Sequence, residues 1–371
     1  MMTIPSTMAA VLLTGHGGLD VLEYREDVPV PVPAPGEVLI RVAAAGVNNT
    51  DVNTRIGWYS KKVTGATSEG PAAIDASDAS WAGVAMTFPR IQGADCCGRI
   101  VATGEGVDPA RMGERVIVRS MMRAPVASRP FECWTFGSEC DGAFAQFAVA
   151  PSAETYAVTS DWTDAELASI PCAWSTAENM LERAGVGAER ILVTGASGGV
   201  GSAAVQLARR RGATVIAVAG AAKAEGVRAL GASEVIDRDS DPAAVLGQES
   251  VDAVIDVVAG ATWPRFLDIL KRGGRYATSG AIGGPLVELD LRTLYLKDLT
   301  LVGCTAQDDV VFDKLVRAVE EGTVRPLVAA TFPLSAIRQA QRIFMAKTHI
   351  GKLVLLPPPV KKESRGKTGG T

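Results

Sequence analysis

Residues 191–226, "ILVTGASGGVGSAAVQLARRRGATVIAVAGAAKAEG", contain the pattern that decides the fold. An apolar run is followed by a cluster of small residues, a helix-like stretch and a second apolar run. A strand, a tight turn, a helix and a second strand in this order make one βαβ unit. Apolar runs at 234–237, 252–258, 274–280 and 299–304 continue the alternation. The sequence therefore predicts an α/β fold with a doubly wound parallel sheet.

The small-residue cluster between 195 and 201 has the features of a dinucleotide-binding turn. Gly198 lets the backbone approach a pyrophosphate, and Gly201 lets the helix pack closely on the strand. Ala196 stands where the first glycine of such a turn is expected. The helix that follows directs free N–H groups and the positive end of its dipole at the phosphates. A purely structural glycine-rich turn is the alternative. The residues expected to bind the cofactor are Ala196, Ser197, Gly198, Gly199, Val200 and Gly201.

The second apolar run ends without the carboxylate that usually binds the ribose of NAD. Residues 219–222 are Ala, Gly, Ala and Ala, and the first ionised group is Lys223. Small residues such as Gly220 leave room for a 2′-phosphate, which Lys223 attracts, and Arg238 follows the third strand at the same edge. We therefore expect NADP(H) as the cofactor. The alternative is that Lys223 is an ordinary solvated residue at the start of a helix.

The rest of the chain predicts a second, β-rich domain. Strands are expected at 36–46, 96–107, 113–120 and 142–151, with the second and third forming a hairpin-like pair. Residues 60–87 interrupt them as a long loop or insertion without clear period. From about 161 helices are expected, with Asp161 or Thr163 as the cap, and after 305 two further helices precede a last strand at 351–357. We predict a β-rich catalytic domain over 1–160 and 306–371, ending in a disordered tail at 356–371, and a dinucleotide-binding domain over 161–305.

Composition excludes several classes of function. The chain has 371 residues, 47% hydrophobic and 21% charged, with a formal net charge of −4. We expect no nucleic-acid partner, because such surfaces are basic, and no membrane partner, because no apolar run is long enough to span a bilayer. The first residues lack the positive region of a signal peptide, which favours the cytoplasm. The two histidines and six cysteines show no metal-ligand spacing, and we interpret the cysteines as small buried hydrophobic residues of a reducing compartment.

Several motifs in order resemble the medium-chain dehydrogenase/reductase superfamily. They are "PGEVLIRVAAAGVNNTD" (35–51), "GADCCGRIVATGEGV" (93–107), "IPCAWSTAENML" (170–181), "VTGASGGVGSAAVQLA" (193–208) and "GKLVL" (351–355). The chain is most similar to the zinc-free quinone oxidoreductase (zeta-crystallin-like) branch, from about residue 8 to 356. This resemblance implies a GroES-like β domain, closed by the C-terminal segment, beside a Rossmann domain, with the active site between them. It also implies a dimer, the common state of the relatives.

The resemblance also predicts that the site holds no metal. Zinc members of the superfamily carry a cysteine in the stretch matching "GVNNTD" and a His-Glu pair in the stretch matching "QGADCCG". This chain has Asn48 at the first place and Ala94-Asp95 at the second. Without a metal, hydride transfer to a conjugated acceptor is easier than oxidation of a simple alcohol, because the developing charge is delocalised onto a carbonyl oxygen. We predict an NADPH-dependent oxidoreductase for a quinone or another α,β-unsaturated carbonyl compound.

Further site residues follow from the family motifs. The resemblance implies that Asn48 lies near the nicotinamide, where its amide could donate to the substrate oxygen or the ribose; capping of its own turn is the alternative. Thr176 is implied near the nicotinamide, with a helix-start hydroxyl as the alternative. Tyr59 matches a tyrosine proposed as proton donor in enoyl reductases, with packing as the alternative. Ser279, Gly280 and Cys304 are expected beside the cofactor through their backbones. Lys352 is expected to face the cofactor or the solvent.

The insertion and the substrate each allow more than one interpretation. We expect Trp58, Tyr59 and Trp81 to make the insertion a lid over the cleft; a decorative surface loop is the alternative. The competing functions are an enoyl-thioester reductase, a zinc-independent reductase similar to alcohol dehydrogenases, and an NADPH-binding protein without turnover. The physiological acceptor is not encoded in any motif, because it depends on the shape of the pocket.

Overall fold

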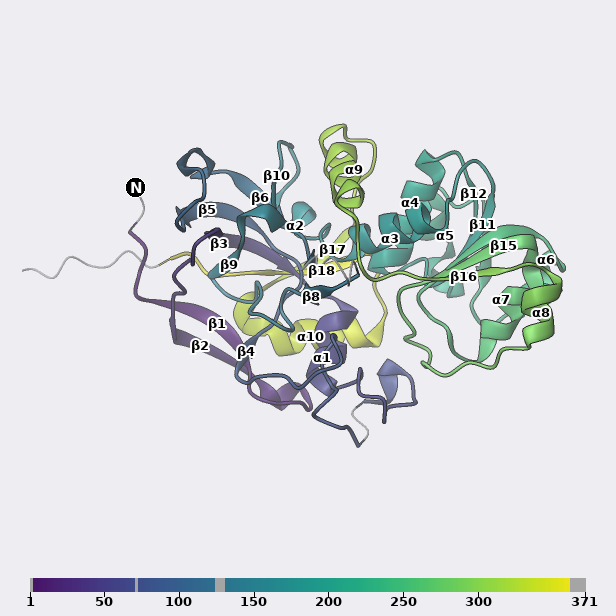
Figure 1. Cartoon of the computed structure of the whole chain (residues 1–371), viewed down its shortest axis with the longest axis horizontal. Coiled ribbons are helices and arrows are strands. Elements are labelled where there is room, and N and C mark those ends of the chain that lie inside the picture. Colours follow the sequence, from purple (N-terminus) through teal and green to yellow (C-terminus); the bar gives the residue numbers. More distant parts are fainter. Residues whose placement is uncertain (1–2, 71–72, 124–130, 361–371) are drawn as a thin grey trace, which may run out of the picture.

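The computed structural model describes residues 3–70, 73–123 and 131–360, which form two lobes joined side by side (Figure 1). The last part of the expected tail, 361–371, lies outside the described residues. The expected α/β architecture is confirmed, because one lobe is β-rich and the other is built on a parallel sheet. In the part of the chain that the structure describes, no helix is long and apolar enough to cross a membrane.

The parallel sheet has the strand order β13-β12-β11-β14-β15-β16, with every neighbouring pair parallel. The strands are β11 (Arg190–Val193), β12 (Thr214–Ala219), β13 (Glu234–Asp237), β14 (Val251–Asp256), β15 (Leu270–Thr278) and β16 (Thr300–Gly303). The helices that accompany them are α3 (Ala173–Arg183), α4 (Gly199–Arg210), α5 (Ala224–Ala229), α6 (Pro242–Leu246), α7 (Trp263–Ile269), α8 (Leu291–Leu296) and α9 (Asp309–Glu320). The apolar runs expected from the sequence coincide with these strands.

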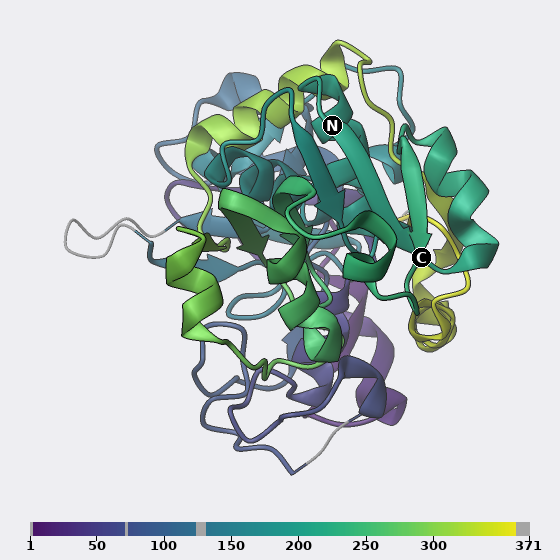
Figure 2. The same cartoon turned by 90° about the vertical axis from the view of Figure 1, so that its right-hand side faces the viewer.

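Alternating side chains explain why both faces of this sheet are covered by helices (Figure 2). Ile191 and Val193 of β11 point into a core shared with α3 and α4, whereas Leu192 between them joins a core on the other face with Trp263 and Phe266 of α7. Successive strand residues point to opposite faces, so a continuous apolar run fills both cores. The packing of β11 into both cores fixes the position of its carboxyl end, where the glycine-rich turn begins.

The β-rich lobe contains a sheet of order β10-β6-β5-β3-β18-β17, with β9 also pairing with β3, and the smaller sheets β2-β1-β4 and β7-β8. Its strands are β1 (Thr7–Leu13), β2 (Leu22–Pro29), β3 (Glu37–Gly46), β4 (Arg90–Ile91), β5 (Cys97–Thr103), β6 (Arg115–Val118), β7 (Met121–Arg123), β8 (Cys133–Thr135), β9 (Phe147–Pro151), β10 (Thr155–Ala157), β17 (Val328–Pro333) and β18 (Lys352–Leu356). Its helices are α1 (Asn49–Ile56), α2 (Asp164–Leu167) and α10 (Ile337–Ala346). β18 pairs antiparallel with β3, which confirms that the C-terminal segment closes this lobe.

The four strands expected in this lobe are present as β3, β5, β6 and β9, and β5 pairs antiparallel with β6 as expected. Seven strands were not expected from the sequence, namely β1, β2, β4, β7, β8, β10 and β17. Of the two expected caps, Thr163 is the one that begins α2, because its hydroxyl accepts from the amide of Glu166 at 3.2 Å.

The insertion joins the two lobes. Its described residues, 60–70 and 73–87, contain one short 3₁₀ turn and no strand or α-helix, as the sequence indicated. The buried residue Thr67 donates its backbone N–H to the carbonyl of Ile282 in the other lobe at 3.1 Å. The indole N–H of Trp58 donates to the carbonyl of Gly65 at 3.1 Å and ties the insertion to the end of α1. The segment therefore bridges the lobes at their junction.

Candidate active site

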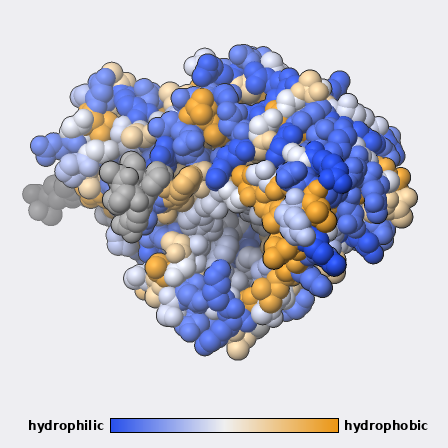
Figure 3. Space-filling view, turned by 45° about the vertical axis from the view of Figure 1, so that its right-hand side comes forward, coloured by the Kyte–Doolittle hydropathy of each residue, from blue (hydrophilic) through white to orange (hydrophobic). Residues whose placement is uncertain are grey.

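A cavity of about 1270 Å³ runs between the lobes and reaches from the glycine-rich turn to the insertion. Figure 3 shows the hollow from the open side, with hydrophobic surface beside it. Of the residues predicted for the site, the cavity is lined by Asn48, Tyr59, Thr176, Ser197, Gly198, Gly199, Val200, Gly201, Gly220, Lys223, Arg238, Ser279 and Gly280. Residues far apart in the sequence therefore meet around one space.

The bend of the glycine-rich turn is made by Gly195 and not, as predicted, at position 196. Gly195 has φ +56°, the left-handed conformation that favours glycine, whereas Ala196 is fully buried and does not line the cavity. The alanine at position 196, where a glycine is expected, is therefore tolerated because Gly195 supplies the positive φ of the turn. Gly198 caps α4 with an extended backbone, and the first N–H groups of α4 face the cavity without helical partners. An added Cβ at Gly201 would overlap Gly195 and lie 2.6 Å from Cα of Ala196.

The edge beyond β12 is lined by small residues, by the basic Lys223 and Arg238, and by Asp237 and Asp239 on either side of Arg238. The space beside Gly220 is bordered by Arg238, whose Nε would lie 3.7 Å from a Cβ added there. Lys223 lies close enough for its pKa to be lowered, first by burial and then by the charge of Arg238. Lys223 Nζ donates to the backbone carbonyl of Lys347, which leaves its other hydrogens free for a ligand. Arg238 is largely exposed and faces Asp239 only loosely, at 3.9 Å.

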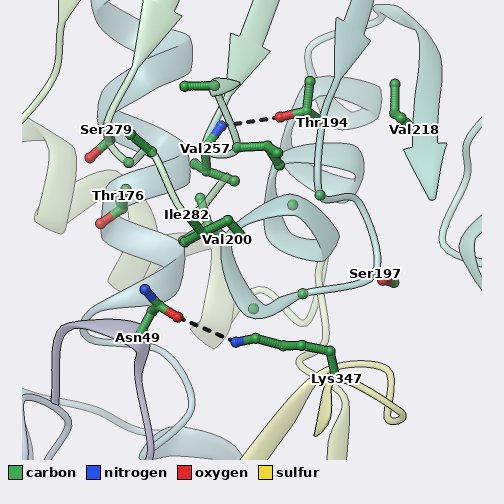
Figure 4. A pocket seen from close by; sticks show the side chains of 18 of the residues that line it. Asn49, Thr176, Thr194, Ser197, Val200, Val218, Val257, Ser279, Ile282 and Lys347 are labelled. Carbon is green, nitrogen blue, oxygen red and sulfur yellow. Dashed lines mark hydrogen bonds between the residues drawn. The ribbon is translucent and has the colours of Figure 1, made fainter. Parts of the chain in front are cut away.

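Lys347, which was not among the predicted site residues, also reaches the cavity. It ends α10 with φ +52°, and Figure 4 shows its side chain extending to Asn49, whose Oδ1 accepts from Nζ at 3.3 Å. Burial, followed by the charges of Lys223 and Lys352, lowers the pKa of Lys347 to about 8. No sequence signal marks it, because α10 approaches the glycine-rich turn only through the folding of the C-terminal segment. A bound anion would relieve the repulsion among these cations.

A hydroxyl pair lies at the other end of the cavity. The phenol of Tyr59 and the hydroxyl of Thr50 are 3.0 Å apart, and both residues line the cavity. Burial raises the pKa of Tyr59, so its hydroxyl keeps its proton over the physiological pH range. Thr176 on α3 faces the same space beside Ser279 (Figure 4). Thr50 was not predicted, although it belongs to the quoted "NNTD" stretch.

Asn48 lines the cavity, but its amide is engaged elsewhere. Its Nδ2 donates to Oδ2 of Asp95 at 2.8 Å, and its Oδ1 accepts from Nζ of Lys352. Its side chain is therefore engaged within the protein, and no hydrogen bond from it caps its own turn. Asp51 caps the turn instead, because Oδ2 accepts from the amide of Asn48 at 2.7 Å. Burial raises the pKa of Asp51 to about 7.

Two other predicted cofactor residues lie outside the cavity lining. Lys352 is neither solvated nor directed at the cofactor; it is buried and donates to Asn48 and, at 2.7 Å, to Asp95. The reason is long-range, since the pairing of β18 with β3 brings residue 352 beside Asn48. Cys304 is buried beside its strand, and the next residue, Thr305, lines the cavity in its place.

The outer wall of the cavity is largely apolar. Trp58 and Trp81 contribute from the two ends of the insertion, and Met121 and Phe131 contribute from the β7–β8 region. The amide of Ala82 donates to Glu139 at 3.0 Å and holds the insertion against that region. These side chains suit a flat apolar molecule more than a charged one.

Among the described residues, no group of three or more His, Cys, Asp or Glu is placed to hold a metal ion. The residues at the positions implied for zinc ligands also do not fit the metal. Ala94 has no donor atom, and the amide of Asn48 is not one of the side chains that zinc prefers. All six cysteines are free thiols.

Comparisons with known proteins agree with this architecture. Residues 34–160 match the family model for the alcohol dehydrogenase GroES-like domain, and residues 199–321 match that for zinc-binding dehydrogenases. Quinone oxidoreductase from Rattus norvegicus is 30% identical over 96% of this chain and 100% of its own length. Acryloyl-coenzyme A reductase from Metallosphaera sedula is 29% identical over 94% of this chain and 99% of its own. The crystal structure of a putative alcohol dehydrogenase from Sinorhizobium meliloti 1021 is 46% identical, with a TM-score of 0.85 over 96% of this chain and 98% of that one.

The fold and the site together define an oxidoreductase that uses a nicotinamide dinucleotide. The chain belongs to the medium-chain dehydrogenase/reductase superfamily, and within it to the quinone oxidoreductase branch.

Proposed function

We propose that this protein is an NADPH-dependent, metal-free oxidoreductase that transfers hydride to a quinone or another α,β-unsaturated carbonyl compound. The observation that carries the proposal is one continuous cavity that joins an end with Lys223 and Arg238, where no carboxylate follows β12, to an apolar end with a protonated phenol at Tyr59. When bound, the nicotinamide supplies the hydride. The chain then has to hold the dinucleotide, orient the acceptor and place a proton near its oxygen or carbon.

The chain's own groups are suited to these tasks. The N-terminus of α4 and its glycine turn hold the pyrophosphate, and Lys223 with Arg238 holds the 2′-phosphate. The backbone from Ser279 to Gly280 and the hydroxyl of Thr176 border the nicotinamide end. The apolar walls exclude water and leave the acceptor carbonyl facing the Tyr59–Thr50 pair, whose phenol can donate a hydrogen bond or a proton to the developing oxyanion.

The experiment that tests the proposal is NADPH oxidation with a panel of quinones, enones and a crotonyl thioester, together with metal analysis of the purified protein. Turnover of conjugated acceptors without bound zinc supports the proposal. Binding of NADPH without oxidation by any acceptor would favour the non-catalytic alternative. Activity that depends on stoichiometric zinc would contradict it.

An enoyl-thioester reductase is the second candidate, and the contact between Tyr59 and Thr50 favours it. One relative of this chain, from Metallosphaera sedula, is named an acryloyl-coenzyme A reductase, and its name indicates an enoyl thioester as the substrate of that relative. The two functions differ in their need for a proton. Hydride addition to a quinone leaves a weakly basic phenolate, whereas addition to an enoyl thioester leaves a strongly basic enolate that must be protonated.

Replacing Tyr59 by phenylalanine should separate the two candidates. We expect kcat for an enoyl thioester to fall by about 100-fold, because a positioned general acid is lost, while turnover of a quinone changes little. The measurement is steady-state NADPH oxidation with both acceptor types at fixed pH. Thr163→Val, which removes a hydroxyl far from the cavity, is the control. Equal losses with both acceptors would assign Tyr59 a packing role.

We also propose that the insertion forms a lid over the acceptor. The support is the contact of Thr67 with Ile282 across the lobes and the position of Trp81 in the cavity wall. Trp81→Ala should raise KM for a bulky quinone by about tenfold, since a large apolar contact worth about 1.4 kcal/mol or more is lost, and leave the Kd for NADPH unchanged. Acceptor titrations and NADPH fluorescence measure the two quantities. An unchanged KM across small and bulky acceptors would show a surface loop without a role in binding.

We further propose that the protein is a cytoplasmic homodimer without nucleic-acid or membrane partners. Free cysteines favour a reducing compartment. β16 is an edge strand with exposed Leu301, and the neighbouring Leu286, Leu291 and Tyr295 are more than half exposed. An apolar edge of this kind is suited to pairing with the same edge of a second copy about a two-fold axis. Light scattering should give twice the mass of one chain, and the mass of a single chain would overturn the proposal.

A further inference from the structure

Five residues form a polar cluster beside the acceptor end of the cavity; four of them are buried, and the fifth, Cys172, is partly exposed in the cavity wall. They are Asn48, Asp51, Asp95, Cys172 and Lys352. The carboxylate of Asp95 is fully buried, and the side chain of Lys352 is 4% exposed. Such groups are costly to bury unless they are paired and hydrogen-bonded, and this cluster satisfies that condition.

The hydrogen bonds of the cluster converge on the ammonium of Lys352. Nζ donates to Oδ2 of Asp95 at 2.7 Å and to Oδ1 of Asn48. The other carboxylate oxygen of Asp95 accepts from the amide of Cys172 at 2.6 Å. The thiol of Cys172 also lies within electrostatic reach of Lys352 and Asp95, and its pKa is raised first by burial and then by Asp95.

The backbone explains why the ammonium reaches this place. β18 begins at Lys352, and its pairing with the end of β3 sets the side chain beside Asn48. The stem of Lys352 passes under the glycine-rich turn, where a Cβ added at Gly199 would lie 3.0 Å from its Cδ. The amide of Gly351 donates to the carbonyl of Ser197 at 3.1 Å and fixes the entry to the strand. Contacts to the glycine-rich turn therefore fix the backbone and stem of Lys352, and the β-rich lobe holds its ammonium.

The groups around the ammonium have the chemistry of a cation site. Nζ of Lys352 lies between an amide oxygen of Asn48 and a carboxylate oxygen of Asp95, and its charge also acts on the nearby thiol of Cys172. The carboxylate and the thiol are ligand types that a divalent transition metal accepts. An ammonium held in the same place repels such a metal strongly.

We propose that the ammonium of Lys352 is a built-in cation that occupies the position between Asn48 and Asp95, beside Cys172, and keeps a divalent metal out of it. The inference rests on the proposal that the enzyme works without a metal ion, and it gives a physical reason for the absence of that ion. It also assigns Lys352 a positioning role, because the ammonium fixes the amide of Asn48, which lines the cavity, and does not itself touch the cavity.

The test replaces the charged Lys352 by a neutral residue and adds a divalent metal ion. Full-length wild type and Lys352→Met are dialysed against Co²⁺, and thiolate-to-cobalt absorption is recorded with metal content. We expect Lys352→Met to bind cobalt at least about 100-fold more tightly than wild type, because repulsion between two buried cations is removed. Adding Cys172→Ser to Lys352→Met should abolish the absorption band, which separates this site from the other thiols.

The outcomes distinguish this inference from the proposed function. A wild-type protein that binds cobalt at the Cys172 site overturns both. A metal-free wild type together with a folded Lys352→Met that binds no cobalt overturns only the inference. If Lys352→Met is unstable, its Tm is measured with and without Cd²⁺: a rise that wild type lacks supports the inference, and no rise overturns it. Lys352→Met with Asp95→Asn removes both charges, and it should fold without any cation.

Discussion

Replacing Gly198 by alanine is expected to weaken NADPH binding by about 100-fold, or about 2.8 kcal/mol, without lowering Tm. Gly198 has φ −83° and ψ 178°, a conformation that alanine adopts without strain. The added Cβ would find only the carbonyl oxygen of Gly195 nearby, at 3.3 Å. The protein therefore tolerates the methyl group, and the loss falls on the pyrophosphate that is proposed to lie against this backbone.

Gly201→Ala provides the matched comparison within the same turn. Here the added Cβ would overlap the backbone at Gly195 and lie 2.6 Å from Cα of Ala196, so α4 would have to move away from β11. Overpacking of this kind costs about 1–3 kcal/mol of stability. We expect a lower Tm for Gly201→Ala and an unchanged Tm for Gly198→Ala, measured by thermal melting beside NADPH titration. If Gly198→Ala bound NADPH as tightly as wild type does, the pyrophosphate of the dinucleotide would not lie against this turn.

The sequence was sufficient to predict the parallel sheet, because its strands depend on local pattern. Both faces of β11 are buried, so Ile191, Leu192 and Val193 are all apolar. Apolar runs of this kind that alternate with helices are compatible with few folds other than a parallel sheet covered by helices. The hairpin of β1 and β2 was not predicted. β2 is an edge strand whose "EYRED" segment is mostly charged, so no alternation marks it in the sequence.

The candidate site was predictable where it is local and unpredictable where it depends on pairing across the chain. The glycine turn and the absence of a carboxylate after β12 could be interpreted within one βαβ unit. The burial of Lys352 and the approach of Lys347 to Asn49 depend on where β18 and α10 pack, more than 290 residues from their partners. Gly195 supplied the bend expected at Ala196, because a positive φ one residue earlier serves the same turn.

The double replacement of Lys223 and Arg238 by alanine is expected to reverse the proposed preference for NADPH over NADH. A charge-assisted hydrogen bond contributes about 1.5–3 kcal/mol, so each single variant should weaken NADPH binding by about tenfold or more and the double variant by at least about 100-fold. NADH has no 2′-phosphate, and its Kd should change less than about threefold. Kd values from calorimetry with both dinucleotides give the ratio directly.

Arg228→Ala is the matched control, because Arg228 lies exposed on α5 in the same region but does not line the cavity. The pH dependence gives an independent check. Lys347 carries its charge below its lowered pKa of about 8, so the affinity of wild type for NADPH should decline as the pH rises past this value. Lys347→Met should remove this decline. If the double variant kept the wild-type NADPH-to-NADH ratio, the basic edge beside Gly220 would not be the 2′-phosphate site, and the cofactor would have to be reassigned.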